Sequence, residues 1–154
     1  MDMPRPTAAH EQLSRFVGHW NGTETIHPTP FDPKGGTALG RVHNRRVLDG
    51  FAVVQDYEQE RNGKVNFSGH GVLRFEPAKG KVEMHWFDSL GQPPGVFEGT
   101  WNGDVLTVVH TGQQGHVRAT WDFAVTGQYA YSMEVSGDGA TWMRFMNAVY
   151  TKSD

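Results

Sequence analysis

The polar residues best suited to chemistry lie on segments that neighbour one another along the chain. They are Asn44, Arg46, Gln55 and Asp88. One cation, one carboxylate and two amides are the groups that orient the polar end of a bound molecule, provided that they converge in a cavity. Convergence requires that the segments carrying them lie side by side and turn the same face inward. The chemistry therefore depends on the elements that hold these residues.

Composition restricts the class of protein. The 154 residues include 19 Gly and no Cys, and 12% of them are aromatic. This length suits one domain, expected over 1–154, and abundant glycine with aromatics is typical of short strands joined by tight turns. Without cysteine there is no thiol nucleophile and no disulfide framework. The net charge is −3 with both signs scattered, which argues against a nucleic-acid surface.

Alternating hydrophobicity predicts an all-β chain after one short helix. Residues 1–6 are expected to form a loose tail and residues 7–16 a helix with Thr7 as its N-cap. The apolar runs are too short to span a bilayer and no secretory signal is visible, so a cytoplasmic location is expected. About ten strands are predicted, near residues 17–27, 36–48, 51–60, 64–76, 81–88, 95–101, 104–111, 116–125, 128–136 and 141–151.

Turn residues set the register between these strands. A two-residue turn at Asp49-Gly50, a three-residue loop at 61–63 and a turn at 77–80 make successive hairpins. They place in one row Asn44, Gln55, Gly69 and Asp88, and in the next row Arg46, Val53, Gly71 and Trp86. The opposite face carries matched charges, such as Arg74 opposite Glu83. Successive hairpins with a common inner face predict an up-and-down antiparallel barrel.

Two inward glycines leave room inside this barrel. In the first interpretation, the gap beside Gly69 and Gly71 is a ligand site, with Glu24 near it on the face of Trp20. In the second, the polar groups form a closed buried network, in which Arg46 pairs with Asp88 or Glu24 and the glycines pack against Trp86. The remaining cavity walls would come from aromatic residues that also serve as core: Tyr57, Phe67, Trp86, Trp121 and Tyr131.

The stretch FVGHWNGTE joins the helix to the first strand. Its G-x-W sequence lets the backbone bend at Gly18 and places Trp20 at the closed end of a barrel. A G-x-W after a short helix and before a β-meander resembles the calycin superfamily of lipocalins and fatty-acid-binding proteins. In order along the chain, further stretches resemble the bacterial family known as domain of unknown function 1579: VLDGFAVVQDYEQ, FSGHGVLRFEP, HWFDSLGQPP, FEGTWNGDVLT and SGDGATW. The resemblance implies a calycin-like barrel and no established reaction.

The last strand contains a further candidate, Arg144. Fatty-acid-binding proteins hold a carboxylate with an Arg two residues before a Tyr on the last strand, whereas position 146 here is Met. One length of the preceding turn sends Met143 and Phe145 inward. The other length sends Trp142, Arg144 and Met146 inward, and both alternatives stay open.

Histidines raise the alternative of a haem site, because nitrobindin-like barrels bind haem. The registers place His43, His70 and His85 outside and His110 inside, beside Phe97 and Val108 across a turn at Asn102-Gly103. No paired His motif at metal-ligand spacing appears, so no metal is expected and haem is the less favoured reading.

Enzyme signatures are also lacking. No serine lies in G-x-S-x-G and no glycine-rich stretch has P-loop spacing. The remaining enzyme hypothesis uses Asp88 or Glu24 as a buried acid or base. The sequence thus favours a barrel that binds a partly apolar small molecule without a cofactor. A second copy of the chain is an alternative partner.

Overall fold

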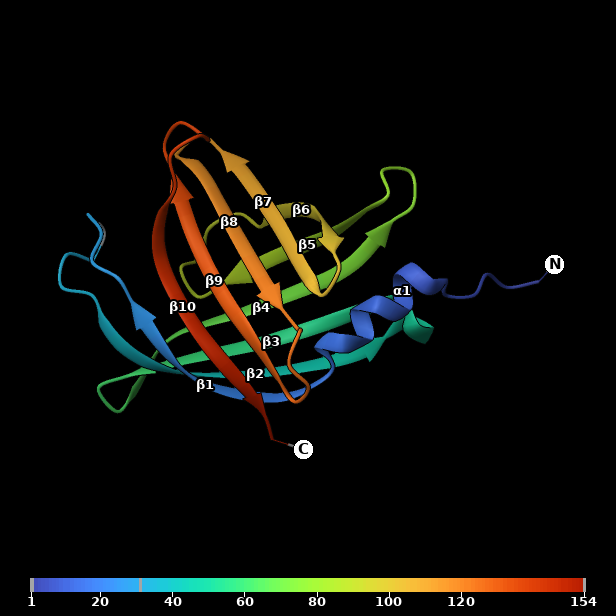
Figure 1. Cartoon of the computed structure of the whole chain (residues 1–154), viewed down its shortest axis with the longest axis horizontal. Coiled ribbons are helices and arrows are strands. Elements are labelled where there is room, and N and C mark those ends of the chain that lie inside the picture. Colours follow the sequence, from blue (N-terminus) through green and yellow to red (C-terminus); the bar gives the residue numbers. More distant parts are fainter. Residues whose placement is uncertain (1, 31, 154) are drawn as a thin grey trace.

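The computed structural model describes residues 2–30 and 32–153, in which ten antiparallel strands close into a barrel (Figure 1). Each strand pairs with its neighbours in sequence, and β1 also pairs with β10. The strands are β1 (Gly18–Ile26), β2 (Gly36–Val47), β3 (Ala52–Arg61), β4 (Lys64–Glu76), β5 (Lys81–Asp88), β6 (Gly95–Asn102), β7 (Val105–Gly112), β8 (Gly115–Asp122), β9 (Gln128–Ser136) and β10 (Met143–Lys152). The predicted all-β up-and-down barrel is confirmed.

A short helical segment covers one end of the barrel (Figure 1). It consists of α1 (Ala8–Gln12) and the 3-10 turn η1 (Leu13–Phe16), after Thr7 in the N-cap position. Phe16 is fully buried, and its carbonyl oxygen accepts hydrogen bonds from Trp20 Nε1 and Asn44 Nδ2, both at 2.8 Å. We call this the closed end. No helix in residues 2–30 or 32–153 is long and apolar enough to cross a bilayer.

Three of the predicted registers are confirmed. Across β2 and β3 Asn44 lies opposite Gln55, and across β4 and β5 Gly69 lies opposite Asp88. Across β8 and β9 the partners are Trp121 and Tyr131, again as predicted. Because the outer face carries the expected charge pairs, the barrel interior receives the apolar side chains.

Two predicted registers are wrong, each by a shift of two residues. Between β3 and β4, Tyr57 rather than Gln55 lies opposite Gly69, because the turn contains only Asn62 and Gly63 and a bulge follows at Gln59. Between β6 and β7, Phe97 is likewise not the partner of Val108, which pairs with Gly99 instead. A shift of two preserves which face of a strand points inward, so both errors leave the predicted interior intact.

The outer face of the barrel carries charge pairs, as predicted. Arg74 Nη1 lies 2.7 Å from Glu83 Oε1, and Arg118 Nη2 lies 3.0 Å from Glu134 Oε1. Toward the closed end the interior is filled by apolar side chains: Leu13, Phe16, Leu73, Leu106 and Val108 are each at most 1% exposed. The space inside the barrel therefore lies toward the opposite end, which we call the mouth.

Candidate functional site

A cavity of about 530 Å³ lies inside the barrel toward the mouth. Its floor includes Val42, Gln55 and Ala119, which are at most 6% exposed. Its walls are mainly aromatic: Tyr57, Phe67, Trp86, Phe97, Trp121, Tyr129, Tyr131, Phe145 and Tyr150. The volume and this mixture of apolar walls with few polar groups are typical of small-molecule sites.

A buried carboxylate supports one wall of the cavity. Glu24, on β1, is 0% exposed, and it accepts hydrogen bonds from the Tyr57 hydroxyl at 2.7 Å and from Gln59 Nε2 at 2.8 Å. The Tyr150 hydroxyl, on β10, donates a third. Since a buried carboxylate is costly without donors, these hydrogen bonds fix the two tyrosine rings that face the cavity.

The tyrosine hydroxyls of this cluster remain protonated. Burial raises the pKa of Tyr57 and of Tyr150 well above the usual value, and the nearby Glu24 carboxylate raises both further. The pKa of Tyr131 is raised for the same two reasons. These hydroxyls therefore act as hydrogen-bond donors near neutral pH, and none of them supplies a phenolate nucleophile.

A second carboxylate lies at the edge of the cavity. Asp88 ends β5, and it accepts hydrogen bonds from Trp86 Nε1 and from the backbone N–H of Leu90, both at 3.0 Å. The Trp86 ring occupies the space that the missing Gly69 side chain leaves, since a Cβ there would lie 2.2 Å from Trp86 Cζ2. The glycines thus serve close packing against Trp86, as the second interpretation of the sequence proposed.

Some polar groups of the cavity have no partner. Gln55 is 6% exposed, and its side-chain amide makes no hydrogen bond to any described residue. The hydroxyl of Tyr131 and the indole N–H of Trp121 are likewise without a described partner, and both residues line the cavity. A buried polar group that faces open space is most stable when a ligand or water bonds to it.

An ion pair and a histidine line the cavity near the mouth. Arg61 Nη1 lies 2.7 Å from Asp32 Oδ2, and Arg61 Nη2 donates to the Gly35 carbonyl oxygen at 3.0 Å. The first contact lowers the pKa of the Asp32 carboxyl. His110 faces inward as predicted, with Nδ1 2.9 Å from the Val96 carbonyl oxygen.

Seven of the eleven predicted ligand-binding residues line this cavity: Gln55, Tyr57, Phe67, Trp86, Asp88, Trp121 and Tyr131. Glu24 lies directly behind the wall. Asn44 lies opposite Gln55 as predicted, but it does not line the cavity, because its amide donates to the Phe16 carbonyl oxygen at the closed end. The prediction that Arg46 pairs with Asp88 or Glu24 is wrong, because Arg46 pairs with Glu11. Arg46 lies on the inward face of β2, as predicted from the alternation of side chains. Because β2 ends at the next residue, its side chain extends past the strand, and Arg46 Nη2 lies 2.5 Å from Glu11 Oε1.

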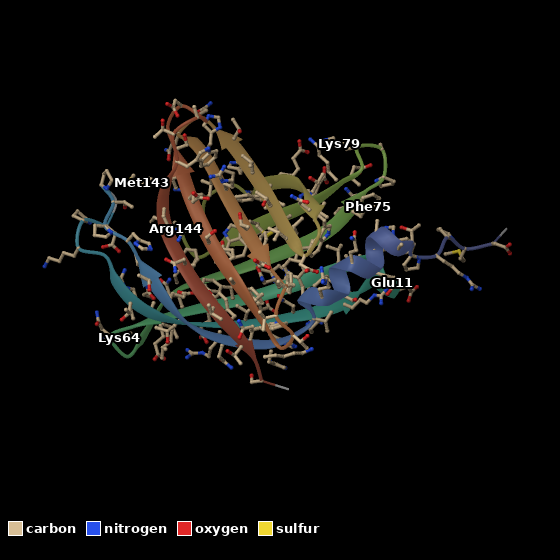
Figure 2. All side chains as sticks on the ribbon, in the orientation of Figure 1. Glu11, Lys64, Phe75, Lys79, Met143 and Arg144 are labelled. Atoms are coloured by element: carbon tan, nitrogen blue, oxygen red, sulfur yellow. The ribbon has the colours of Figure 1, made fainter. Side chains whose placement is uncertain are left out.

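A bulge in β10 determines which side chains of the last strand face the cavity. The register of β10 against β9 shifts between Arg144 and Met146, so Phe145 and Met146 both line the cavity. Arg144 is exposed at the mouth end of β10 and does not line it (Figure 2). Neither of the two alternatives from sequence describes this arrangement.

Three of the cavity residues that sequence reasoning missed bear hydrogen-bonding groups that the structure pairs: Gln59, Arg61 and Tyr150. Gln59 points to the same inward face as Gln55 and Tyr57, because alternate residues of a strand share a face. This alternation alone could have predicted that Gln59 lines the cavity. Tyr150 was missed because the bulge in β10 hid its orientation. Arg61 had been assigned to a loop, whereas it ends β3 and pairs with Lys64.

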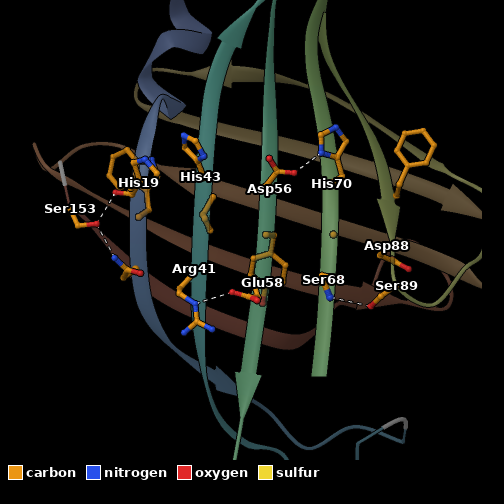
Figure 3. Close-up of a pocket in the computed structure, with 16 residues that line it drawn as sticks. His19, Arg41, His43, Asp56, Glu58, Ser68, His70, Asp88, Ser89 and Ser153 are labelled. Carbon is orange, nitrogen blue, oxygen red and sulfur yellow. Dashed lines mark hydrogen bonds and ion pairs between the residues drawn. The ribbon is translucent and has the colours of Figure 1, made fainter. Parts of the chain in front are cut away.

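A separate groove crosses the outside of β1 to β5 (Figure 3). One row of cross-strand partners runs along it: His19, His43, Asp56, His70 and Phe87. The rings of His19 and His43 stack at 3.9 Å, and His70 Nδ1 lies 2.8 Å from Asp56 Oδ1. Among the described residues, no three His, Asp or Glu side chains are grouped to hold a metal ion.

The family model for a protein of unknown function, DUF1579, matches residues 5–152. The chain belongs to the DUF1579 family. The fold of this family member is similar to that of Rv2717c from M. tuberculosis, with 18% identity, a TM-score of 0.73, and coverage of 96% of this chain and 99% of the other. It is also similar to the S-type phycobiliprotein lyase CPES from Guillardia theta, with 10% identity, a TM-score of 0.63, and coverage of 96% and 94%. A comparison with curated proteins gave no match. The expected family and the expected closed antiparallel barrel are confirmed.

Proposed function

We propose that this barrel binds a small, partly apolar molecule in its interior cavity. The observation that carries the proposal is the Gln55 amide, which is 6% exposed, lines a cavity of about 530 Å³ and has no described hydrogen-bond partner. A ligand in the cavity could give this amide the hydrogen-bond partner that no described residue supplies. The aromatic walls favour an apolar body for the rest of the molecule.

The polar end of the ligand is expected near Gln55 and Asp88, the two of the four predicted polar residues that line the cavity. Trp121 and Tyr131 offer an indole N–H and a hydroxyl on the opposite side of the barrel interior. The phycobiliprotein lyase supports the proposal through its fold alone, since its barrel is similar to this one.

A ligand screen by thermal shift tests this function, with a variant that obstructs the mouth. Gly95 lines the cavity, and a Cβ there would contact the His110 ring at 3.6–3.7 Å, so Gly95→Leu adds a side chain without a severe clash. Compounds that raise the melting temperature of the native protein are expected to lose this effect in the variant.

Gly137→Leu is the matched control. Gly137 is exposed in the loop after β9, and a Cβ there would meet nothing within 4 Å. The control should keep the stabilisation by each compound. If compounds stabilise both variants equally, they bind elsewhere and the proposed function is wrong.

A further inference from the structure

Three aromatic side chains of the cavity donate their polar hydrogen to a carboxylate. Trp86 Nε1 donates to Asp88, and the hydroxyls of Tyr57 and Tyr150 donate to Glu24. They come from β5, β3 and β10, so the arrangement recurs around the barrel and is not confined to one hairpin. All three rings line the cavity.

This arrangement makes the ring faces more negative. The face of an aromatic ring already attracts cations through its quadrupole. A hydrogen bond from the indole N–H or the phenol O–H to an anion pushes electron density into the ring and strengthens that attraction. Water-poor surroundings also screen the carboxylate charge weakly, so its field reaches the cavity.

The cations of the barrel do not offset these carboxylates. Among the described residues, no Arg, Lys or His nitrogen lies within 4.0 Å of a carboxylate oxygen of Glu24 or Asp88. Arg61 is the sole Arg or Lys among the described residues that line the cavity, and its guanidinium pairs with Asp32 at the mouth. The interior therefore lacks a positive group for its two carboxylates.

We infer that the cavity takes an organic cation, in which an ammonium or amidinium group is carried on an apolar body. This rests on the proposed function and names its ligand class. The cationic group would lie against the rings of Tyr57 and Trp86, near Asp88. The Gln55 amide oxygen would accept a hydrogen bond from a protonated amine.

The same geometry disfavours carboxylate ligands. A fatty acid or other anion would enter a space that has Asp88 at its edge and Glu24 behind its wall, and no described residue offers it an unpaired guanidinium. Arg144, which the sequence suggested as a carboxylate-binding residue, is exposed and does not line the cavity. Like charges in a poorly screened interior repel, so an anion should bind more weakly than a neutral molecule of the same shape.

Three probes of similar shape test the inference: trimethylphenylammonium, its neutral isostere tert-butylbenzene, and the anion 4-tert-butylbenzoate. Their dissociation constants can be measured by NMR from the indole N–H signals of Trp86 and Trp121. We expect the cation to bind about tenfold more tightly than the neutral isostere, as cation–π attraction and one nearby carboxylate permit. The benzoate should bind most weakly.

Asp88→Asn is the variant that tests the cause. It removes the charge and keeps one oxygen, which can still accept from Trp86 Nε1 and hold the ring, while the bond from the Leu90 backbone N–H to the other oxygen is lost. We expect affinity for the cation to fall about tenfold and affinity for the neutral isostere to stay unchanged. Asp56→Asn is the matched control, because Asp56 lies on the outer face of β3 beside His70 (Figure 3), and it should leave both affinities unchanged.

The outcomes separate the two proposals. If tert-butylbenzene binds as tightly as the cation, or if Asp88→Asn leaves the preference intact, the cation inference is overturned while a binding cavity remains. If none of the three probes shifts the indole signals and the Gly95→Leu screen finds no cavity ligand, the proposed function fails as well.

Discussion

Gly69 shows how one absent side chain determines the shape of the cavity. A Cβ at this position would lie 2.2 Å from Trp86 Cζ2 and 2.3 Å from Cη2, so Gly69→Ala must displace the indole. Displacement of a packed ring costs about 1–3 kcal/mol, and it should also change the Trp86 fluorescence. Urea unfolding and emission spectra measure both effects.

Gly71→Ala provides the comparison. Its Cβ would lie 3.3 Å from Trp86 Cε3 and 3.7 Å from Met84 Cγ, which requires only a slight adjustment. We expect a smaller loss of stability and an unaltered emission spectrum. Equal losses for the two variants would show that Trp86 does not depend on Gly69 for its position.

The hydroxyl of Tyr150 should matter for stability more than that of Tyr131. Tyr150→Phe removes one of the donors to the fully buried Glu24 carboxylate. Loss of a donor to a buried charged group costs about 1.5–3 kcal/mol. The free energy of unfolding from urea titration measures it.

Tyr131→Phe is the matched control, since both tyrosines line the cavity. The Tyr131 hydroxyl has no described hydrogen-bond partner, so its removal should change stability by less than about 0.5 kcal/mol. A larger loss for Tyr131→Phe than for Tyr150→Phe would contradict the assigned role of Glu24.

At the scale of the element, the loop between β9 and β10 is organised by one carboxylate. Asp138 Oδ1 accepts hydrogen bonds from the backbone N–H of Thr141 and of Ala140, both at 2.8 Å, and from the Ser136 hydroxyl at 3.0 Å. These bonds, the one from Thr141 first, lower the pKa of Asp138 from 3.8 to about 2.

A lowered pKa in the folded state makes stability depend on pH in a known direction. The contribution of Asp138 is complete above its ordinary pKa of 3.8 and is lost as the pH falls toward about 2. Asp138→Ala should therefore lower the melting temperature at neutral pH, and the difference from the native protein should shrink across that acidic range. A difference independent of pH would mean that the carboxylate charge contributes nothing.

The strand register shows how far the sequence alone could predict these elements. Turns such as Asp49-Gly50 and 77–80 gave the correct pairing of Asn44 with Gln55 and of Gly69 with Asp88. The pairing of β3 with β4 was wrong because the shorter turn and a nearby bulge each shift it by one residue in the same direction, and sequence does not reveal a bulge directly. The side chains predicted to point inward still do so, and seven of the eleven predicted ligand-binding residues therefore line the cavity.

The predictions for Arg46 and Arg144 were wrong for a different reason. The alternation of side chains along a strand tells which face of the sheet a side chain points to. It does not tell how far along the barrel axis that side chain lies. The Arg46 side chain points to the inward face of β2, but the strand ends at the next residue. The side chain therefore pairs with Glu11 in the helical segment. Arg144 lies beside the bulge of β10, where alternation breaks down. Alternation of side chains predicts orientation poorly at strand ends and at bulges.

At the scale of the whole molecule, the helical segment and the cavity depend on each other. The Phe16 ring contacts Trp121 at 5.4 Å and Phe123 at 4.9 Å between ring centroids, and Trp121 forms part of the cavity wall. The ring that closes the barrel thus also supports the surface on which a ligand would rest. Closure at one end is what makes the other end the entrance.

Phe16→Ala should for this reason affect both stability and the cavity. Loss of a fully buried phenylalanine ring costs about 3–5 kcal/mol, and the void beneath Trp121 should alter its indole N–H signal. The Phe16 carbonyl, which accepts from Trp20 and Asn44, is retained, so the effect isolates the ring. Urea unfolding and NMR measure the two consequences.

Arg46→Ala separates packing from charge at the same end of the barrel. Its pair with Glu11 is exposed, with side chains 33% and 56% accessible, and exposed pairs contribute little to stability. The Arg46→Ala variant should unfold almost as the native protein does and leave the Trp121 signal unmoved. If it destabilised the barrel as much as Phe16→Ala, an ion pair rather than a buried ring would hold the helical segment in place. The closed end would then loosen with rising salt, whereas closure by apolar packing predicts no such dependence.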